Sequence, residues 1–215
     1  MKKLLIPGLL FIVLLATCVY LVQNHLSYRN VMVKFGENIA GVEMLILQDD
    51  RQVKSVVNDS EIRIKDGEYT IKTTGSSDYN QVNDVITITE DGQEIFINPN
   101  YTEEKLATLL EGQENTLFSE IKSTVALGNT YKINPGKLYI HGDWYGTTIV
   151  PNLSDEELRQ NYVDVFRVVA KREGDTWKLI TEVPQLILNR SEYPEIPTEV
   201  LSETNRQYGD VDLPF

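Results

Sequence analysis

A histidine and an aspartate lie two positions apart in the second half of the chain, at His141 and Asp143. On a strand these side chains would share a face, because successive side chains alternate between the two faces. That arrangement would suit a hydrogen-bonded acid–base couple or two ligands of one metal ion. In a turn before Trp144, solvent and backbone groups would satisfy both side chains instead. We favour the turn, and His141 is a candidate because it is the one histidine in a predicted folded domain.

Two further side chains join His141 and Asp143 as candidates for lining a ligand pocket. Arg167 belongs to an otherwise apolar predicted strand, where it would either bind an anionic ligand in a cavity or pair with an acidic neighbour. Trp144 and the next residue, Tyr145, would either line a pocket or a carbohydrate platform, or supply core area with one polar tip at an edge. For Arg167 we favour pairing with an acidic neighbour, and for Trp144 we favour core packing. The candidate pocket residues are therefore His141, Asp143, Trp144 and Arg167.

Signatures of other chemistry are missing from the sequence. It contains no dinucleotide fingerprint, no phosphate-binding loop and no Gly-x-Ser-x-Gly nucleophile elbow. The acidic runs at Asp49-Asp50 and Asp155-Glu156-Glu157 lack the alternating oxygen ligands of a calcium loop. We therefore predict no catalytic residue, no metal site and no cofactor, and we predict that the chain is not an enzyme.

The charge and the cysteine content exclude two more classes. Of 215 residues, 32 are acidic and 20 are basic, which gives a net charge of -12. Such a charge would repel a phosphate backbone, so nucleic acid is excluded as a partner. The single cysteine cannot form an intramolecular disulfide. Packing must therefore stabilise the fold.

The N-terminus indicates a membrane anchor. Lys2 and Lys3 precede an uncharged apolar run over residues 4–22, which is about the 20 residues that a helix needs to cross a bilayer. Basic residues before a span stay cytoplasmic. The run therefore predicts a single transmembrane helix that binds the lipid bilayer, with a cytoplasmic N-terminus and an extracytoplasmic remainder.

Two processing alternatives depend on the residues around Cys18. Ala16-x-Cys18 fits a cleavage site after a short apolar core, which would release a secreted protein. The run Leu15-Ala16-Thr17-Cys18 resembles a bacterial lipoprotein signal, in which Cys18 would be lipidated. Residues 19–22 remain apolar beyond both candidate sites, so we favour a retained anchor.

After the leader, apolar residues recur with a period of two, which is typical of half-buried strands. Residues 31–98 contain about six such short strands at sandwich-like spacing. Asp66-Gly67 and Asp91-Gly92 each separate two of them, and this dipeptide favours a tight hairpin. The segment therefore predicts a small antiparallel β-sandwich.

Two motifs in this segment resemble the PEGA domain, a transthyretin-like β-sandwich of envelope and surface proteins. The motifs are Ala40-Gly41-Val42 and Ile64-x-x-Gly67-x-Tyr69-x-Ile71. The resemblance covers about residues 31–98. It implies a spacer or adhesive module without catalytic residues.

The remaining chain mixes helices with strands. Thr102 is placed to cap a helix that stops at Gly112, and a second amphipathic helix follows. Strands are predicted over residues 131–133, 137–141 and 144–150, and a long hairpin turns at Glu173-Gly174-Asp175. A capping box at Ser154 and Glu157 predicts a short helix. A last helix would begin at Thr198.

The long hairpin is similar to the closing hairpin of NTF2-like, or cystatin-like, cone folds. Its strands are residues 166–171 and 177–180, with the acidic glycine turn between them. The resemblance covers about residues 115–190. That superfamily contains both enzymes and pure binding modules, so activity stays open.

The predicted fold class is an N-terminal transmembrane helix, then a small antiparallel β-sandwich, then an α+β domain with a curved antiparallel sheet. We expect a membrane-anchored, extracytoplasmic, non-catalytic module that binds an envelope or surface protein. The alternative is a pocket-containing NTF2-like domain that binds or processes a small ligand. The predicted divisions are a leader (1–22), a linker (23–30), the PEGA-like sandwich (31–98), a helix and linker (99–116), the α+β domain (117–208) and an acidic tail (209–215).

Overall fold

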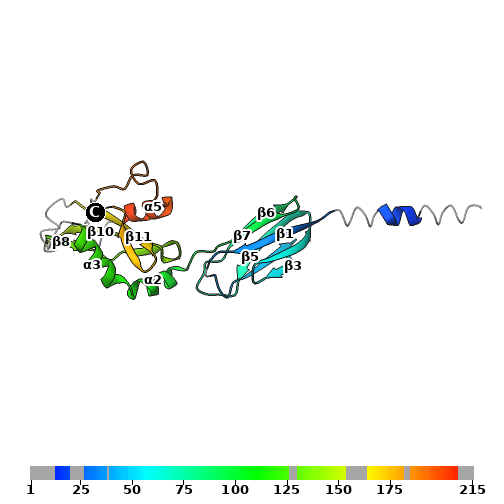
Figure 1. Cartoon of the computed structure of the whole chain (residues 1–215), viewed down its shortest axis with the longest axis horizontal. Coiled ribbons are helices and arrows are strands. Elements are labelled where there is room, and N and C mark those ends of the chain that lie inside the picture. The colour runs from blue at the N-terminus through cyan, green and yellow to red at the C-terminus, as the bar shows by residue number, and fades with distance from the viewer. Residues whose placement is uncertain are drawn as a thin grey trace, which may run out of the picture. The chain divides into compact units, whose positions relative to one another are not determined.

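The computed structural model describes residues 13–19, 27–37, 39–125, 130–153, 164–181 and 185–207. The chain divides into two compact units, Met1–Pro99 (unit 1) and Asn100–Phe215 (unit 2). Unit 1 contains seven strands in its folded part, and unit 2 combines five strands with helices among its described residues (Figure 1). The predicted helix at Ser154 and the acidic tail lie outside the described residues.

The prediction of a transmembrane helix is wrong. Within the described ranges, no helix is long and apolar enough to cross a membrane. The transmembrane helix that stood first in the predicted fold class is therefore corrected. The single-pass localisation is corrected with it, because it depended on that helix.

The described part of unit 1 is a sandwich of two sheets. One sheet has the strand order β4-β1-β7 and the other β3-β2-β5-β6. Strand β1 pairs antiparallel with β4 but parallel with β7, so the predicted purely antiparallel sandwich is wrong at that pair. The strands are β1 (Tyr28–Phe35), β2 (Glu43–Gln48), β3 (Arg51–Val56), β4 (Ser60–Lys65), β5 (Gly67–Thr74), β6 (Asn83–Ile88) and β7 (Gln93–Ile97).

Every second side chain along each strand points into the space between the two sheets and fills it. In β1, Val31 and Val33 are fully buried while Met32 between them is half-buried on the opposite face. Burying an aliphatic side chain of this size contributes about 1.5–3 kcal/mol. The largest group of core residues comes from both sheets: Val31, Val33, Met44, Ile46, Val56, Ile62, Ile64, Tyr69, Ile71, Ile88, Ile95 and Ile97.

Both Asp-Gly dipeptides turn out to be corners between sheets, so the predicted hairpins are wrong. Asp66-Gly67 joins β4 of one sheet to β5 of the other, and Asp91-Gly92 joins β6 to β7 in the same way. Gly67 has φ +149° and Gly92 has φ +78°, values that residues with a Cβ rarely adopt. The dipeptides mark sharp turns as expected, but the returning strands pair with distant partners.

Unit 2 contains a sheet of order β12-β11-β10-β8, with β9 also paired to β10. Strands β8 and β9 flank the Asn134-Pro135-Gly136 turn, yet each pairs with β10 and not with the other. The predicted hairpin around Glu173-Gly174-Asp175 is confirmed as the β11–β12 pair. The strands are β8 (Tyr131–Ile133), β9 (Lys137–Tyr139), β10 (Trp144–Pro151), β11 (Phe166–Glu173) and β12 (Thr176–Leu179).

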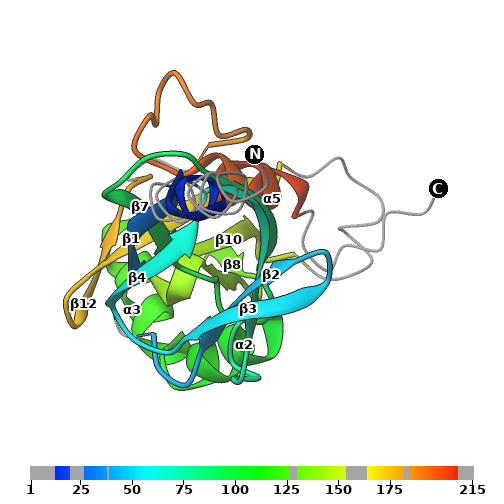
Figure 2. The ribbon, with the colours of Figure 1, turned by 90° about the vertical axis from the view of Figure 1, so that its right-hand side faces the viewer.

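Helices cover both faces of this sheet. Helices α2 (Glu103–Glu111) and α3 (Glu114–Thr124) pack on one face, and α5 (Thr198–Arg206) packs on the other (Figures 1 and 2). The predicted cap of α2 is confirmed, because the Thr102 hydroxyl accepts from the Lys105 amide at 3.4 Å. The predicted Thr198 cap is wrong, since Pro197 precedes the helix and Thr198 begins it. Strand β10 is consequently buried along almost its whole length.

Candidate functional site

His141 and Asp143 lie in the connection between β9 and β10, so they do not share a strand face. Residues Ile140–Gly142 form a short 3-10 turn, and Asp143 closes it by donating its amide to the Ile140 carbonyl at 3.0 Å. The Asp143 carbonyl accepts from the Arg172 amide at 2.7 Å. The His141 ring meets the Tyr101 ring edge-on, with 5.3 Å between centroids. Asp143 is exposed and His141 half-buried.

The backbone of this turn is strained. Ile140, His141 and Gly142 have φ values of 45°, 56° and 83°, and a β-branched residue such as isoleucine rarely adopts a positive φ. Each such residue costs on the order of 1–3 kcal/mol and persists where surrounding packing determines it. Helix α2 supplies that packing, with Leu109 close to Gly142.

Trp144 lies in the core beneath α5 and is 6% exposed. Lys171 places its ammonium group 5.4 Å from the centre of the indole ring. The next residue, Tyr145, is fully buried on the opposite face of the sheet, where its ring meets Trp177 edge-on. Burial raises the pKa of Tyr145 to about 12. These two aromatic side chains thus fill the two cores of unit 2.

Arg167 binds backbone carbonyls, a role that sequence reasoning missed. The buried guanidinium donates to the carbonyls of Val165 at 2.7 Å, of Asn205 at 3.2 Å and of Leu186. Leu186 and Asn205 belong to the C-terminal segment that includes α5. Arg167 therefore fixes residues 185–207 to the start of β11.

A second set of polar contacts joins the two ends of the same segment, residues 185–207, to each other. The Leu188 amide donates to the Asn205 side chain at 2.8 Å, and the Asn205 amide group donates to the Leu188 carbonyl at 2.9 Å. On the sheet below, the Tyr139 hydroxyl accepts from Gln207 at 2.9 Å. Burial raises the pKa of Tyr139 to about 12. The α5 face of unit 2 is consequently packed with side chains that have structural partners.

The candidate residues do not form one constellation. Trp144 pairs with Lys171 across the β10–β11 ladder, whereas Arg167 pairs with Thr148. Four residues along a strand separate these positions by about 13 Å. In the part of the chain that the structure covers, no three His, Cys, Asp or Glu side chains are placed to hold a metal ion. Cys18, the candidate lipidation residue, is an exposed free thiol.

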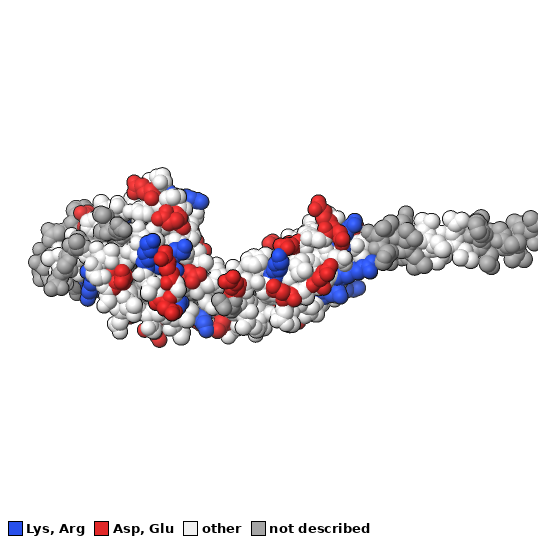
Figure 3. Space-filling view, viewed as in Figure 1, with Lys and Arg blue, Asp and Glu red and all other residues white. Residues whose placement is uncertain are grey.

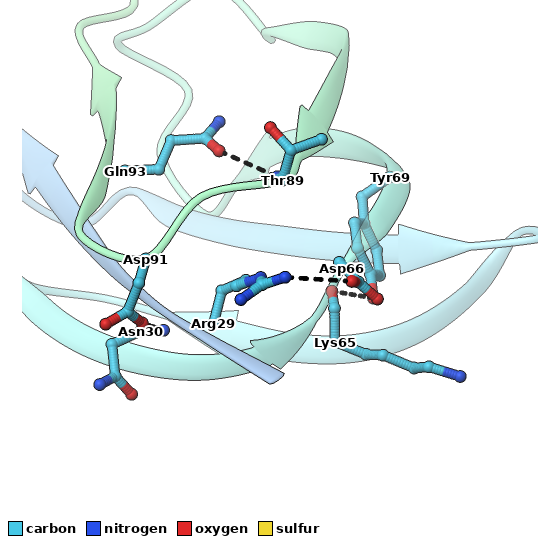
Figure 4. A network of polar contacts seen from close by, with 8 residues as sticks. All are labelled: Arg29, Asn30, Lys65, Asp66, Tyr69, Thr89, Asp91 and Gln93. Carbon is cyan, nitrogen blue, oxygen red and sulfur yellow. Dashed lines mark hydrogen bonds and ion pairs between the residues drawn. The ribbon is translucent and has the colours of Figure 1, made fainter. Parts of the chain in front are cut away.

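A polar network closes the end of unit 1 where both corners meet β1 (Figure 4). The Asn30 amide donates to the Asp91 carboxylate at 2.7 Å, and Arg29 lies 3.5 Å from the Asp66 carboxylate. The Tyr69 hydroxyl donates to the Lys65 carbonyl at 2.8 Å, as in the tyrosine corner of other sandwiches. The Gly67-x-Tyr69 motif singled out in the sequence is therefore a structural corner.

The outer face of the β4-β1-β7 sheet, which we call the β1 outer face, has the composition of a binding surface. Phe96 is 64% exposed at its edge, although Ile95 and Ile97 on either side are buried. Arg63 lies over the Tyr28 ring at 5.6 Å. Arginine, methionine and aromatic residues are enriched in protein interfaces. The side chains that strand alternation directs outward are Tyr28, Asn30, Met32, Lys34, Glu61, Arg63, Lys65, Glu94 and Phe96.

Sequence reasoning missed this surface, although one signal was present. Residues 93–97 alternate, yet the outward position 96 holds a phenylalanine where a polar residue is usual. Charged side chains of both signs are interspersed over the molecular surface seen in Figure 3, with acidic ones predominating. The β1 outer face combines an exposed aromatic side chain with such mixed charge.

Comparisons with known proteins add little. No family model and no curated protein matches the chain. A solved structure of a DUF3823 family protein from Bacteroides ovatus is similar over 71% of this chain and 96% of that chain, with 8% identity and a TM-score of 0.28. Similarity at this level carries no argument about fold or function. The PEGA-like and NTF2-like resemblances stay predictions.

Proposed function

We propose that the chain is a non-catalytic protein-binding module that contacts its partner through the β1 outer face of unit 1. One observation carries the proposal: the 64% exposure of Phe96 on a face that also presents Met32, Tyr28 and Arg63. An exposed phenyl ring contributes little to the stability of the fold. A partner that covered the ring would gain the free energy of burying an aromatic side chain, and such anchors supply most of the affinity at interfaces.

The arrangement of charges supports a protein partner. Lys34 binds Glu94 at 2.6 Å beside the phenyl ring, and Arg63 stacks on Tyr28 near the other end of the face. Polar groups around an apolar centre are the usual anatomy of a protein interface. In unit 2, by contrast, the buried Arg167 guanidinium is used in binding backbone carbonyls.

Site-specific photocrosslinking tests the proposal. A benzophenone amino acid replaces Phe96 in one variant and Val85 in a matched control, and both variants are irradiated in the cells that produce the chain. Val85 is 58% exposed on the outer face of the other sheet. We expect a discrete protein adduct from position 96 and none from position 85. Equal labelling at both positions, or no adduct at position 96, contradicts the proposal.

A second candidate function is small-ligand binding by unit 2, which the strained turn at Ile140–Gly142 favours. Strained backbone clusters at binding and catalytic sites. A screen of small molecules by NMR on the full chain would test it. A ligand of this site must shift the resonances of Tyr101 and His141, and His141→Val must weaken binding at least tenfold. If no compound that binds the chain shifts those resonances, this second candidate is eliminated.

A further inference from the structure

Four strand edges border the two sheets of unit 1, and three of them carry features that discourage pairing with another chain. Strand β3 has Arg51 and Lys54 and lies beside a register shift in β2. Strand β4 alternates Glu61, Arg63 and Lys65 on its outward side. Strand β6 carries Asp84 in register with the core residue Ile71. Edge charges, inward charges and bulges of this kind protect natural sheets.

Strand β7 is the least protected of these edges. Its core-facing residues Ile95 and Ile97 are apolar, and its outward residues are Glu94 and Phe96. Within the described part of unit 1, β7 pairs with β1 alone. Glu94 is neutralised by Lys34 of its own sheet. The one charged side chain of β7 is thus paired within its own sheet, so an incoming strand is repelled only where it brings a second carboxylate opposite Glu94.

The backbone of β7 fixes which groups face the open edge. The Ile97 carbonyl accepts from the Gly36 amide at 2.8 Å, so the backbone groups of Ile97 face the β1 side. Along a strand these groups alternate in direction, so Ile95 also faces β1. The amides and carbonyls of Glu94 and Phe96 consequently point toward the open edge.

We propose that a second copy of this chain pairs its β7 antiparallel with this edge, centred on Ile95. Glu94 then lies opposite Phe96 of the second copy, and the reverse pair follows by two-fold symmetry. Each of these two pairs exchanges two backbone hydrogen bonds, which uses all the outward groups of both residues. The proposal rests on the proposed function, because the pairing places the second copy beside Phe96 of the β1 outer face.

Charge selects this register. A register centred on Glu94 would put two carboxylates directly opposite each other, which is destabilising. A register centred on Phe96 would put Glu94 opposite Asn98, which lies beyond the end of β7 at Ile97. In the register centred on Ile95, the Phe96 ring lies between Lys34 of its own sheet and Glu94 of the second copy. A positive and a negative group thus flank each ring.

Sedimentation of the full chain tests the pairing. We expect a concentration-dependent monomer–dimer equilibrium. Phe96→Asp should raise the dimer dissociation constant at least tenfold, because two carboxylates then face each other across the interface. The matched control, Val85→Asp on the other outer face, should leave the constant unchanged. A chain that stays monomeric at all soluble concentrations, or an equal effect of both variants, overturns the proposal.

Disulfide crosslinking tests the register without depending on affinity. In a Cys18→Ser background, a mixture of Glu94→Cys and Phe96→Cys proteins should form the mixed disulfide in preference to either symmetric one. A predominance of a symmetric disulfide overturns the register. A photocrosslinked adduct between position 96 and a different protein, from a chain that sediments as a monomer, overturns the second copy as partner but leaves the proposed function intact.

Discussion

The two units use their sheets in opposite ways. In unit 1 each sheet buries one face in the shared core and leaves the other to solvent, where Phe96 and Val85 are exposed. In unit 2 one sheet is buried on both faces, so that β10 is covered by α3 on one side and α5 on the other. Unit 1 therefore has sheet faces that are open to solvent, whereas Trp144, Tyr145 and Arg167 of unit 2 are used in packing.

The largest effect we expect is on unit 2, from Arg167→Met. The substitution leaves three carbonyls without their cationic donor and should lower the free energy of unfolding by about 3 kcal/mol. Both tryptophans, Trp144 and Trp177, lie in unit 2, so urea unfolding followed by tryptophan fluorescence reports on this unit. Arg206→Met is the control, because that side chain is 73% exposed, and it should cost less than about 1 kcal/mol. Similar costs for both would contradict the anchoring role of Arg167.

Alkaline pH should also weaken unit 2. The pKa values of Tyr139 and Tyr145 are raised to about 12 by burial, against about 10 in an unfolded chain. Their contribution is complete below pH 10 and is lost as pH rises toward 12, because only the unfolded state ionises there. Each tyrosine should lower stability by up to about 1.4 kcal/mol per pH unit in that range.

The same fluorescence-detected unfolding, repeated from pH 9 to pH 12, measures this slope. Tyr139→Phe and Tyr145→Phe should each reduce it. A midpoint that does not change over the range would show that the phenols are not protected from ionisation.

A smaller effect, confined to unit 1, is expected from Tyr69→Phe. The change removes the hydrogen bond to the Lys65 carbonyl, which is worth about 1 kcal/mol. Amide exchange of the buried strands in unit 1 should accelerate about fivefold, while the fluorescence-detected unfolding of unit 2 stays the same. Equal destabilisation of both units would mean that they do not unfold separately.

The smallest effect concerns the strained turn. His141→Val places a β-branched residue at φ 56° and should cost about 1 kcal/mol. His141→Asn should be close to neutral, because asparagine tolerates the left-handed region. The difference between the two variants in the urea midpoint of unit 2 measures the strain, and equal midpoints would mean that the turn relaxes.

Local signals in the sequence predicted local structure well and pairing poorly. Thr102 predicted the start of α2 because a cap depends on residues three positions away. Asp66-Gly67 predicted a turn, but which sheet the next strand joins depends on β2 and β6. The carbonyl contacts of Arg167 involve residues 19 and 38 positions away, which no local pattern indicates. The apolar leader predicted a transmembrane span, and within the described ranges no helix is long and apolar enough to be one.

Amide exchange at β7 tests the central claim most directly. Glu94 and Phe96 direct their backbone amides to the open edge of the β4-β1-β7 sheet, whereas the amides of Ile95 and Ile97 face β1. Exchange of the full chain is measured by NMR at low and at high protein concentration. We predict that exchange at Glu94 and Phe96 slows as concentration rises, while exchange at Ile95 and Ile97 does not change. Rates at Glu94 and Phe96 that are independent of concentration would contradict a second copy bound at this edge.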